Sequence, residues 1–109
     1  MKINISNTLY EIKTTTKFNK GLKKMSKQNK NIEKLIEVVE KIANDIDLEP
    51  KYKNHKLTND KNFKDCYECH IEPNWLLIYK IYNNELILLL FATGSHSDLF
   101  NMWINIKNK

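Results

Sequence analysis

The chain has 109 residues and a net charge of +5, and hydrophobic residues make up 41% of it. This length fits one domain, residues 1–109, and the apolar content excludes an intrinsically disordered chain. The start of the chain lacks the apolar run of a signal peptide, and the longest apolar stretch, 87–92, is too short to cross a bilayer. We therefore expect a cytoplasmic domain with free thiols and no membrane partner, whose charge suits either nucleic-acid phosphates or an acidic protein.

A short strand and two amphipathic helices are predicted in the first half of the chain. Residues 8–14 form the strand. The first helix follows three threonines that suit its N-cap, and its apolar stripe has helical spacing: Phe18, Leu22 and Met25. After the polar connection 26–31, which ends in the capping residue Asn31, apolar residues recur at helical spacing over 32–46. Two such helices predict a helical hairpin that covers one face of a sheet.

The second half of the chain predicts that sheet. Three strand-like runs follow a loop around Pro50, namely 63–71, 75–82 and 85–93. The link Asn83-Asn84 tolerates positive φ and predicts a two-residue hairpin turn. Residues 94–97 end the sheet, and 98–106 form a short closing helix. The expected fold class is α+β, with the helical hairpin packed on an antiparallel sheet of about four strands.

The segment from Cys66 to His70 matches C-x-x-C-H, the pattern of c-type haem attachment. Residues three apart on a strand point to opposite faces, so Cys66 and Cys69 are not expected to converge on a haem or a metal ion. A second cysteine pair for structural zinc is also missing from the sequence. We therefore expect no cofactor and no metal, with Cys69 packed against the helices and Cys66 on the same face as His70.

Three segments, residues 52–57, 68–79 and 93–100, together resemble the YafQ-type branch of the RelE/ParE toxin superfamily, and the likeness covers roughly 8–100. The resemblance implies a RelE-like fold and a type II toxin. Such a toxin enters the ribosomal A site, cuts mRNA and is neutralised by a cognate antitoxin, and the toxin–antitoxin complex contacts operator DNA. Residues 101–109 extend past the usual end of the family and carry no recognisable signal.

The resemblance also assigns residues to the site. It places His55, His70, Asn74 and His96 in the catalytic group, and Trp75 and Phe100 beside the RNA. The family pattern has Asp where this chain has Asn74, Arg where it has Ala92, and commonly Arg in place of Tyr67. Lys56, Lys64 or Lys80 is a candidate to supply the missing positive charge to the substrate, as a flexible point charge.

Histidine suits the chemistry that this resemblance implies. RNA is cut without a metal when its 2′-hydroxyl attacks the adjacent phosphorus, which requires a base, an acid and positive charge near the phosphate oxygens. Imidazole serves both proton roles near neutral pH. A single His in a small domain is more often incidental, but all three His of this chain fall in matching segments. We assign His96 as the acid and His70 or His55 as the base.

The departures from the family pattern predict weakened cleavage. Asn74 cannot accept a proton as a carboxylate does, and losing that help costs about a hundredfold or more. Ala92 removes a guanidinium that would grip phosphate, and losing such a stabiliser costs roughly a hundred- to a thousandfold.

Several alternatives stay open at the level of sequence. Trp75 and Phe100 either stack on mRNA bases or belong to the core. The lysines of the first helix either face ribosomal RNA or form a solvated surface. The whole protein is an RNase toxin, a silent relative that only binds its antitoxin, or a ParE-like gyrase inhibitor, and the three His argue against the last.

Overall fold

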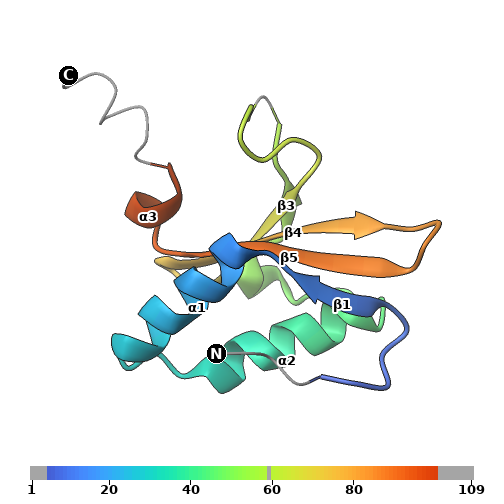
Figure 1. The fold of residues 1–109 in the computed structure, drawn as a ribbon, viewed down its shortest axis with the longest axis horizontal. Helices are drawn as coiled ribbons and strands as arrows, with labels where there is room; N and C mark the ends of the chain where they lie inside the picture. Colours follow the sequence, from blue (N-terminus) through green and yellow to red (C-terminus); the bar gives the residue numbers. More distant parts are fainter. Residues whose placement is uncertain (1–4, 59, 101–109) are drawn as a thin grey trace.

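The computed structural model describes residues 5–58 and 60–100, and it consists of a five-stranded sheet with two helices on one face (Figure 1). Along the sheet the strand order is β1-β5-β4-β3-β2. The elements in chain order are β1 (Glu11–Thr14), α1 (Thr16–Lys27), α2 (Ile32–Ala43), η1 (Pro50–Tyr52), β2 (His55–Lys56), β3 (Tyr67–Glu72), β4 (Trp75–Tyr82), β5 (Ile87–Gly94) and α3 (His96–Phe100).

The sheet confirms the predicted α+β class and differs from the prediction in two details. β1 pairs with β5 in parallel, whereas the other neighbouring strands are antiparallel. The two-residue strand β2, which was expected to be loop, adds a fifth strand at the edge. Side-chain periodicity identifies a strand but not the direction of its partner, and a two-residue strand is too short to show any period.

Both helices follow the predicted caps. Thr15 accepts a hydrogen bond from the Phe18 backbone N–H at the start of α1, and Asn31 accepts one from Glu33 at the start of α2. The apolar stripe of α1 is buried as predicted. However, α2 ends at Ala43 rather than Ile46, because Asp45 adopts a left-handed conformation (φ 58°) and the Ile46 N–H bonds back to the Lys41 carbonyl oxygen. This is a Schellman-type helix end.

The main core lies between the helices and the sheet. It combines buried residues of α1 and α2 with alternate residues of β3, β4 and β5, including Cys69, Trp75 and Leu77. α1 lies directly against β5 because Gly21 has no side chain, and a Cβ atom there would be 2.1 Å from the Thr93 carbonyl oxygen. The end of β5 is thereby fixed from the helix side.

A second, smaller core covers the opposite face of the sheet. We call it the site-face cluster, and it consists of Phe63, Cys66, Leu76, Ile78, Ala92 and Leu99, with Leu57, Phe91 and Phe100 at its margin. Its residues come from the 57–66 loop, from β4 and β5, and from α3. This cluster forms the floor beside which the candidate site residues lie.

Three predicted boundaries differ from the structure. β3 begins at Tyr67 rather than 63, because Asp60 accepts hydrogen bonds from the Asn62 and Phe63 N–H groups and closes a turn there. The β4–β5 connection has four residues, 83–86, rather than two, and Leu86 takes the positive φ (53°). α3 begins at His96 rather than 98, and the remainder of the predicted closing helix lies outside the described residues.

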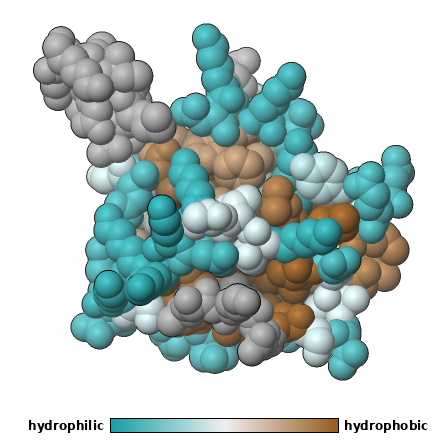
Figure 2. All heavy atoms as spheres, viewed as in Figure 1, coloured by the Kyte–Doolittle hydropathy of each residue, from teal (hydrophilic) through white to brown (hydrophobic). Residues whose placement is uncertain are grey.

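Hydrophilic and hydrophobic residues are unevenly distributed over the surface (Figure 2). Lysines make the α1 surface hydrophilic. Leu9, Ile46 and Leu86 are exposed apolar side chains in the segments before β1, after α2 and before β5. No helix within the described part of the chain is long and apolar enough to pass through a membrane.

Candidate active site

The structure brings the three histidines together on the face of the sheet that the helices leave open. His70 lies on β3, His55 on the edge strand β2, and His96 at the start of α3. The ring centroids of His70 and His96 are 5.6 Å apart. His55 and His70 share a further neighbour, because the Nε2 atoms of both face the same carboxylate oxygen, Oε1 of Glu68, at 3.6 and 3.3 Å. Segments that are far apart in the sequence thus form one cluster.

Glu68 is the site residue that the sequence prediction did not assign. Its side chain is only 7% exposed, and it lies on β3 two residues before His70. Residues two apart on a strand share a face, so this spacing was a usable signal. A buried carboxylate is costly unless it is paired, and within the described structure the partners of Glu68 are the two imidazoles. Glu68 therefore orients two catalytic candidates at once.

His55 is positioned by the loop that leads into β2. The Tyr79 hydroxyl donates a 2.6 Å hydrogen bond to Asn54 Oδ1 and so ties this loop to the sheet. Lys53 adopts a left-handed conformation (φ 49°), and its carbonyl oxygen lies 2.8 Å from His55 Nδ1. A carbonyl oxygen only accepts, so Nδ1 carries the proton and Nε2 is the atom that faces Glu68.

Asn74 fixes the orientation of His96. Its Oδ1 atom lies 3.1 Å from both the backbone N–H and the Nδ1 atom of His96. The backbone N–H only donates, which identifies the atom facing His96 as the amide oxygen, so His96 Nδ1 also donates to it. The Nε2 atom of His96 takes no part in either contact with Asn74. The amide at position 74 therefore holds the His96 ring through its Nδ1 side.

Variants at Asn74 separate orientation from charge. For Asn74→Asp we expect cleavage to rise, because the carboxylate keeps both hydrogen bonds and stabilises a protonated His96. For Asn74→Leu we expect a fall of roughly a hundredfold, because the His96 ring loses its acceptor. The measurement is the rate of mRNA cleavage on ribosomes, with the exposed Asn84→Leu variant as the control. Equal cleavage rates for the parent, Asn74→Asp and Asn74→Leu proteins would contradict an orienting role of Asn74.

The turn that carries His96 is itself held rigidly. The Ser95 N–H donates to Asp98 Oδ2, and the Asp98 N–H donates to Ser95 Oγ, which is a reciprocal cap of α3. Lys24 of α1 lies 2.5 Å from the other carboxylate oxygen. Burial alone would raise the pKa of the Asp98 carboxyl, but the hydrogen bonds from Lys24 and Ser95 together hold the pKa below its usual value. Asp98 therefore stays ionised and keeps this cap.

The two aromatic candidates differ. Trp75 is 0% exposed in the helix-side core, and its Nε1 donates to the Thr93 hydroxyl. The core alternative is therefore the correct one for Trp75, and a stacking role is not retained. Phe100 is half-buried on the site face, and its ring centroid lies 5.5 Å from that of Phe63 and 6.3 Å from that of His96. Phe100 remains a candidate for contact with RNA.

Ala92, where the family pattern has Arg, is fully buried in the site-face cluster. The replacement of Arg by Ala at position 92 thus changes more than the charge, because apolar side chains surround this position. Lys56 is exposed beside His55 on β2 and pairs with Tyr67 in the sheet register. Neighbouring residues of a strand point to opposite faces, so the Lys56 side chain shares the face of Tyr67 rather than that of His55.

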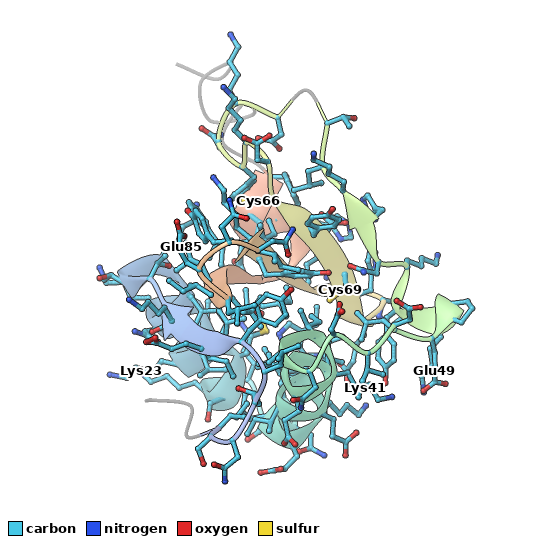
Figure 3. All side chains as sticks on the ribbon, turned by 90° about the vertical axis from the view of Figure 1, so that its right-hand side faces the viewer. Lys23, Lys41, Glu49, Cys66, Cys69 and Glu85 are labelled. Carbon is cyan, nitrogen blue, oxygen red and sulfur yellow. The ribbon has the colours of Figure 1, made fainter. Side chains whose placement is uncertain are left out.

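The cysteines lie apart as predicted. Cys69 belongs to the helix-side core and Cys66 to the site-face cluster, so the C-x-x-C-H segment forms no joint site (Figure 3). Burial raises the pKa of the Cys69 thiol to about 12 and also raises the pKa of Cys66. Both thiols are therefore poor nucleophiles and ligands. In residues 5–58 and 60–100, no group of three or more His, Cys, Asp or Glu side chains is arranged to hold a metal ion.

Known bacterial toxins are similar to this chain in sequence and in fold. Residues 10–101 match the family described as the bacterial toxin of type II toxin–antitoxin systems, YafQ. The mRNA interferase toxin YafQ of Escherichia coli BL21-DE3 is 32% identical over 91 residues, which cover 83% of this chain and 95% of that protein.

Solved structures show the same fold. A metal-bound toxin from Helicobacter pylori superposes with a TM-score of 0.78 and 42% identity, covering 84% of this chain and 99% of that one. The E. coli DinJ–YafQ toxin–antitoxin complex gives a TM-score of 0.74 and 30% identity, covering 84% and 98%. The chain therefore belongs to the YafQ family of type II toxins.

Proposed function

We propose that this protein is an endoribonuclease toxin that cleaves mRNA in the ribosomal A site and is neutralised by a cognate antitoxin. The observation that carries the proposal is the convergence of His55, His70 and His96 beside the site-face cluster. Family membership supports it, because relatives are named mRNA interferase toxins and one is solved with its antitoxin DinJ. Transfer of the A-site specificity rests on the resemblance of the three sequence segments.

The mechanism follows from which imidazole nitrogens are free. His70 Nε2 lies 3.3 Å from Glu68 Oε1, so we assign the Nδ1 lone pair of His70 as the acceptor of the RNA 2′-hydroxyl proton. The 2′-oxygen then attacks phosphorus, a new P–O bond forms, and the bond to the 5′-oxygen breaks. His96 donates its Nε2 proton to that leaving oxygen. The products are a 2′,3′-cyclic phosphate and a free 5′-hydroxyl, and His70 and His96 have exchanged protonation states.

His55 plays a different part from the one expected of a base. Its Nδ1–H is engaged by the Lys53 carbonyl, and its Nε2 faces the Glu68 carboxylate. Both ring nitrogens of His55 thus face fixed neighbours, and neither is directed at a substrate proton. We therefore assign the base to His70.

Induction of the gene, followed by mapping of mRNA 5′ ends on ribosomes, tests the proposal. Growth arrest with cuts inside A-site codons is the expected result, and free RNA should be cut poorly. Arrest without cuts would indicate a gyrase-type inhibitor. No arrest would indicate a silent antitoxin-binding relative, the second candidate, which Asn74 and the buried Ala92 favour. A small acidic protein in the neighbouring reading frame is the expected antitoxin.

Glu68→Gln tests the assignment of the base. The amide keeps the size of the side chain but no longer holds two imidazoles by charge, so we expect cleavage to fall roughly a hundredfold. Glu85→Gln, in the exposed β4–β5 loop (Figure 3), is the matched control and should leave the rate unchanged. Cleavage and thermal unfolding are measured on both. A Glu68→Gln protein that is folded and fully active would exclude Glu68 from the mechanism.

A further inference from the structure

A cleft of about 480 Å³ opens at the end of β3, away from the site-face cluster. It lies between α2, the η1 segment and the β3–β4 turn. Its walls carry three cations, two carboxylates and an apolar surface. The cations are Lys34, Lys51 and Lys53, the carboxylates are Glu37 and Glu72, and the apolar surface comes from Tyr52, Ile71 and Pro73. None of these side chains has been given a role in cleavage so far.

The cleft is continuous with the catalytic cluster at two points. His70, the assigned base, forms part of its wall. Lys53 also lines it, while the carbonyl oxygen of the same residue holds the His55 ring. An RNA strand whose scissile phosphate lies at His70 therefore has this cleft as its nearest enclosed space.

Some charged side chains of the cleft have ion-pair partners and others do not. Glu72 bonds Lys34 and Lys30 at 2.8 and 2.9 Å, and these two hydrogen bonds hold the pKa of its carboxyl below the usual value. This carboxylate therefore stays ionised with its charge compensated. Among the described residues, no acidic side chain forms an ion pair with Lys51 or Lys53. These two ammonium groups are available to an anion.

An aromatic ring lies beside these cations. Tyr52 is half-buried, and Lys51 Nζ lies 5.1 Å from the centroid of its ring, with Lys41 Nζ at 5.9 Å. Ile71 and Pro73 extend the apolar surface of the cleft. Proteins bind single-stranded RNA by this combination, since bases stack on aromatic rings while lysines hold the adjoining phosphates.

We propose that this cleft is a nucleotide subsite, which binds the mRNA nucleotide next to the cleaved bond. Tyr52 supports the base, and Lys51 and Lys53 bind the neighbouring phosphate. The proposal rests on the proposed RNase function. An acidic antitoxin segment would satisfy the two lysines, but it would make no use of the aromatic ring or of the opening toward His70. For these reasons RNA is the occupant that the cleft fits better.

The test measures binding separately from cleavage. A fluorescent 2′-O-methyl RNA oligonucleotide, which has no 2′-hydroxyl to attack, is titrated against the full-length protein at several salt concentrations. For Lys51→Ala/Lys53→Ala we expect weaker binding and a salt slope smaller by about 1.4, from roughly 0.7 for each single-strand phosphate contact. The control, Lys23→Ala/Lys27→Ala on α1, removes the same charge outside the cleft and should change binding less.

Substitutions at Tyr52 test base stacking independently of the two lysines. Tyr52→Phe should bind as the parent does, whereas Tyr52→Leu, which keeps apolar packing, should bind about tenfold more weakly because it loses base stacking. Oligonucleotides carrying 4-thiouridine should photo-crosslink to Tyr52 or its neighbours in the cleft. Equal effects of the two lysine pairs, together with crosslinks confined to α1, would overturn the subsite.

Failure of the subsite and failure of the proposed function give different results. Cleavage of ribosomal mRNA that is lost in His96→Ala but unaffected by the cleft variants would overturn the subsite alone. A parent protein that cuts nothing, yet binds the oligonucleotide in a manner dependent on Lys51, Lys53 and Tyr52, would overturn the nuclease and keep the subsite. Absence of oligonucleotide binding, together with antitoxin binding that Lys51→Ala/Lys53→Ala weakens, would identify the cleft as a protein contact and overturn the RNA proposal.

Discussion

His96→Ala is expected to lower the rate of mRNA cleavage about 10²- to 10⁴-fold, the range for loss of a general acid. His96 is exposed, and only its Nδ1 and backbone N–H are engaged by Asn74. The free Nε2 atom is the donor to the leaving 5′-oxygen, so an alanine at this position leaves that oxygen without a proton. Single-turnover cleavage on programmed ribosomes measures the effect directly.

Two comparisons show whether the loss is chemical. His96→Ala should retain thermal stability and antitoxin binding close to those of the parent, because little buried contact is removed. A 5′-thio leaving group needs no protonation. With a substrate that carries it, the cleavage rates of His96→Ala and the parent protein should differ less. A variant that is equally defective on both substrates would mean that His96 positions RNA rather than donating a proton.

Ala92→Arg is expected to destabilise the protein and not to restore cleavage. The Cβ of residue 92 faces a closed apolar cluster that includes Leu76, Ile78 and Leu99. Overfilling such a core costs about 1–3 kcal/mol, and burying an unpaired guanidinium adds to that cost. The free energy of unfolding, measured in urea, should fall accordingly. The family's arginine therefore cannot be reintroduced here by one substitution.

Lys56→Arg is the matched control for Ala92→Arg, since it places a guanidinium at an exposed position of the edge strand β2 without filling a core. We expect its stability to match that of the parent. An Ala92→Arg protein that unfolds at the parent's urea midpoint and cleaves faster would contradict this account. It would show that the site-face cluster opens readily enough for the guanidinium to reach the substrate.

The helices were predictable because their signals are local. The stripe of Phe18, Leu22 and Met25 and the caps at Thr15 and Asn31 are each encoded within a few residues. Strand boundaries and partners were less accessible. The parallel pairing of β1 with β5 joins the first strand to the last, and no local pattern reports such a contact. The turns at Asp45 and Leu86 depend on non-glycine residues at positive φ, which composition does not reveal.

The site was predicted in part, and the misses have physical causes. Resemblance identified the three histidines, and the structure brings them together. Glu68 was passed over because a carboxylate in a strand is ordinarily a solvated residue, and only its burial between two imidazoles shows otherwise. Trp75 was ambiguous because an aromatic at the start of a strand faces either side of the sheet. The fate of Ala92 depended on neighbours contributed by three other segments.

The Thr93 hydroxyl connects the two sides of the molecule. It accepts from the Trp75 indole and donates to the Leu76 carbonyl oxygen, while the Thr93 carbonyl lies against Gly21 of α1. His96 follows only three residues later. The position of the His96 imidazole thus depends on packing between the sheet and α1, on the face where no RNA is expected to bind. Substitutions in α1 at its contact with β5 are therefore expected to alter catalysis. The proposed activity thus constrains the interface between helix and sheet as well as the face that carries the histidines.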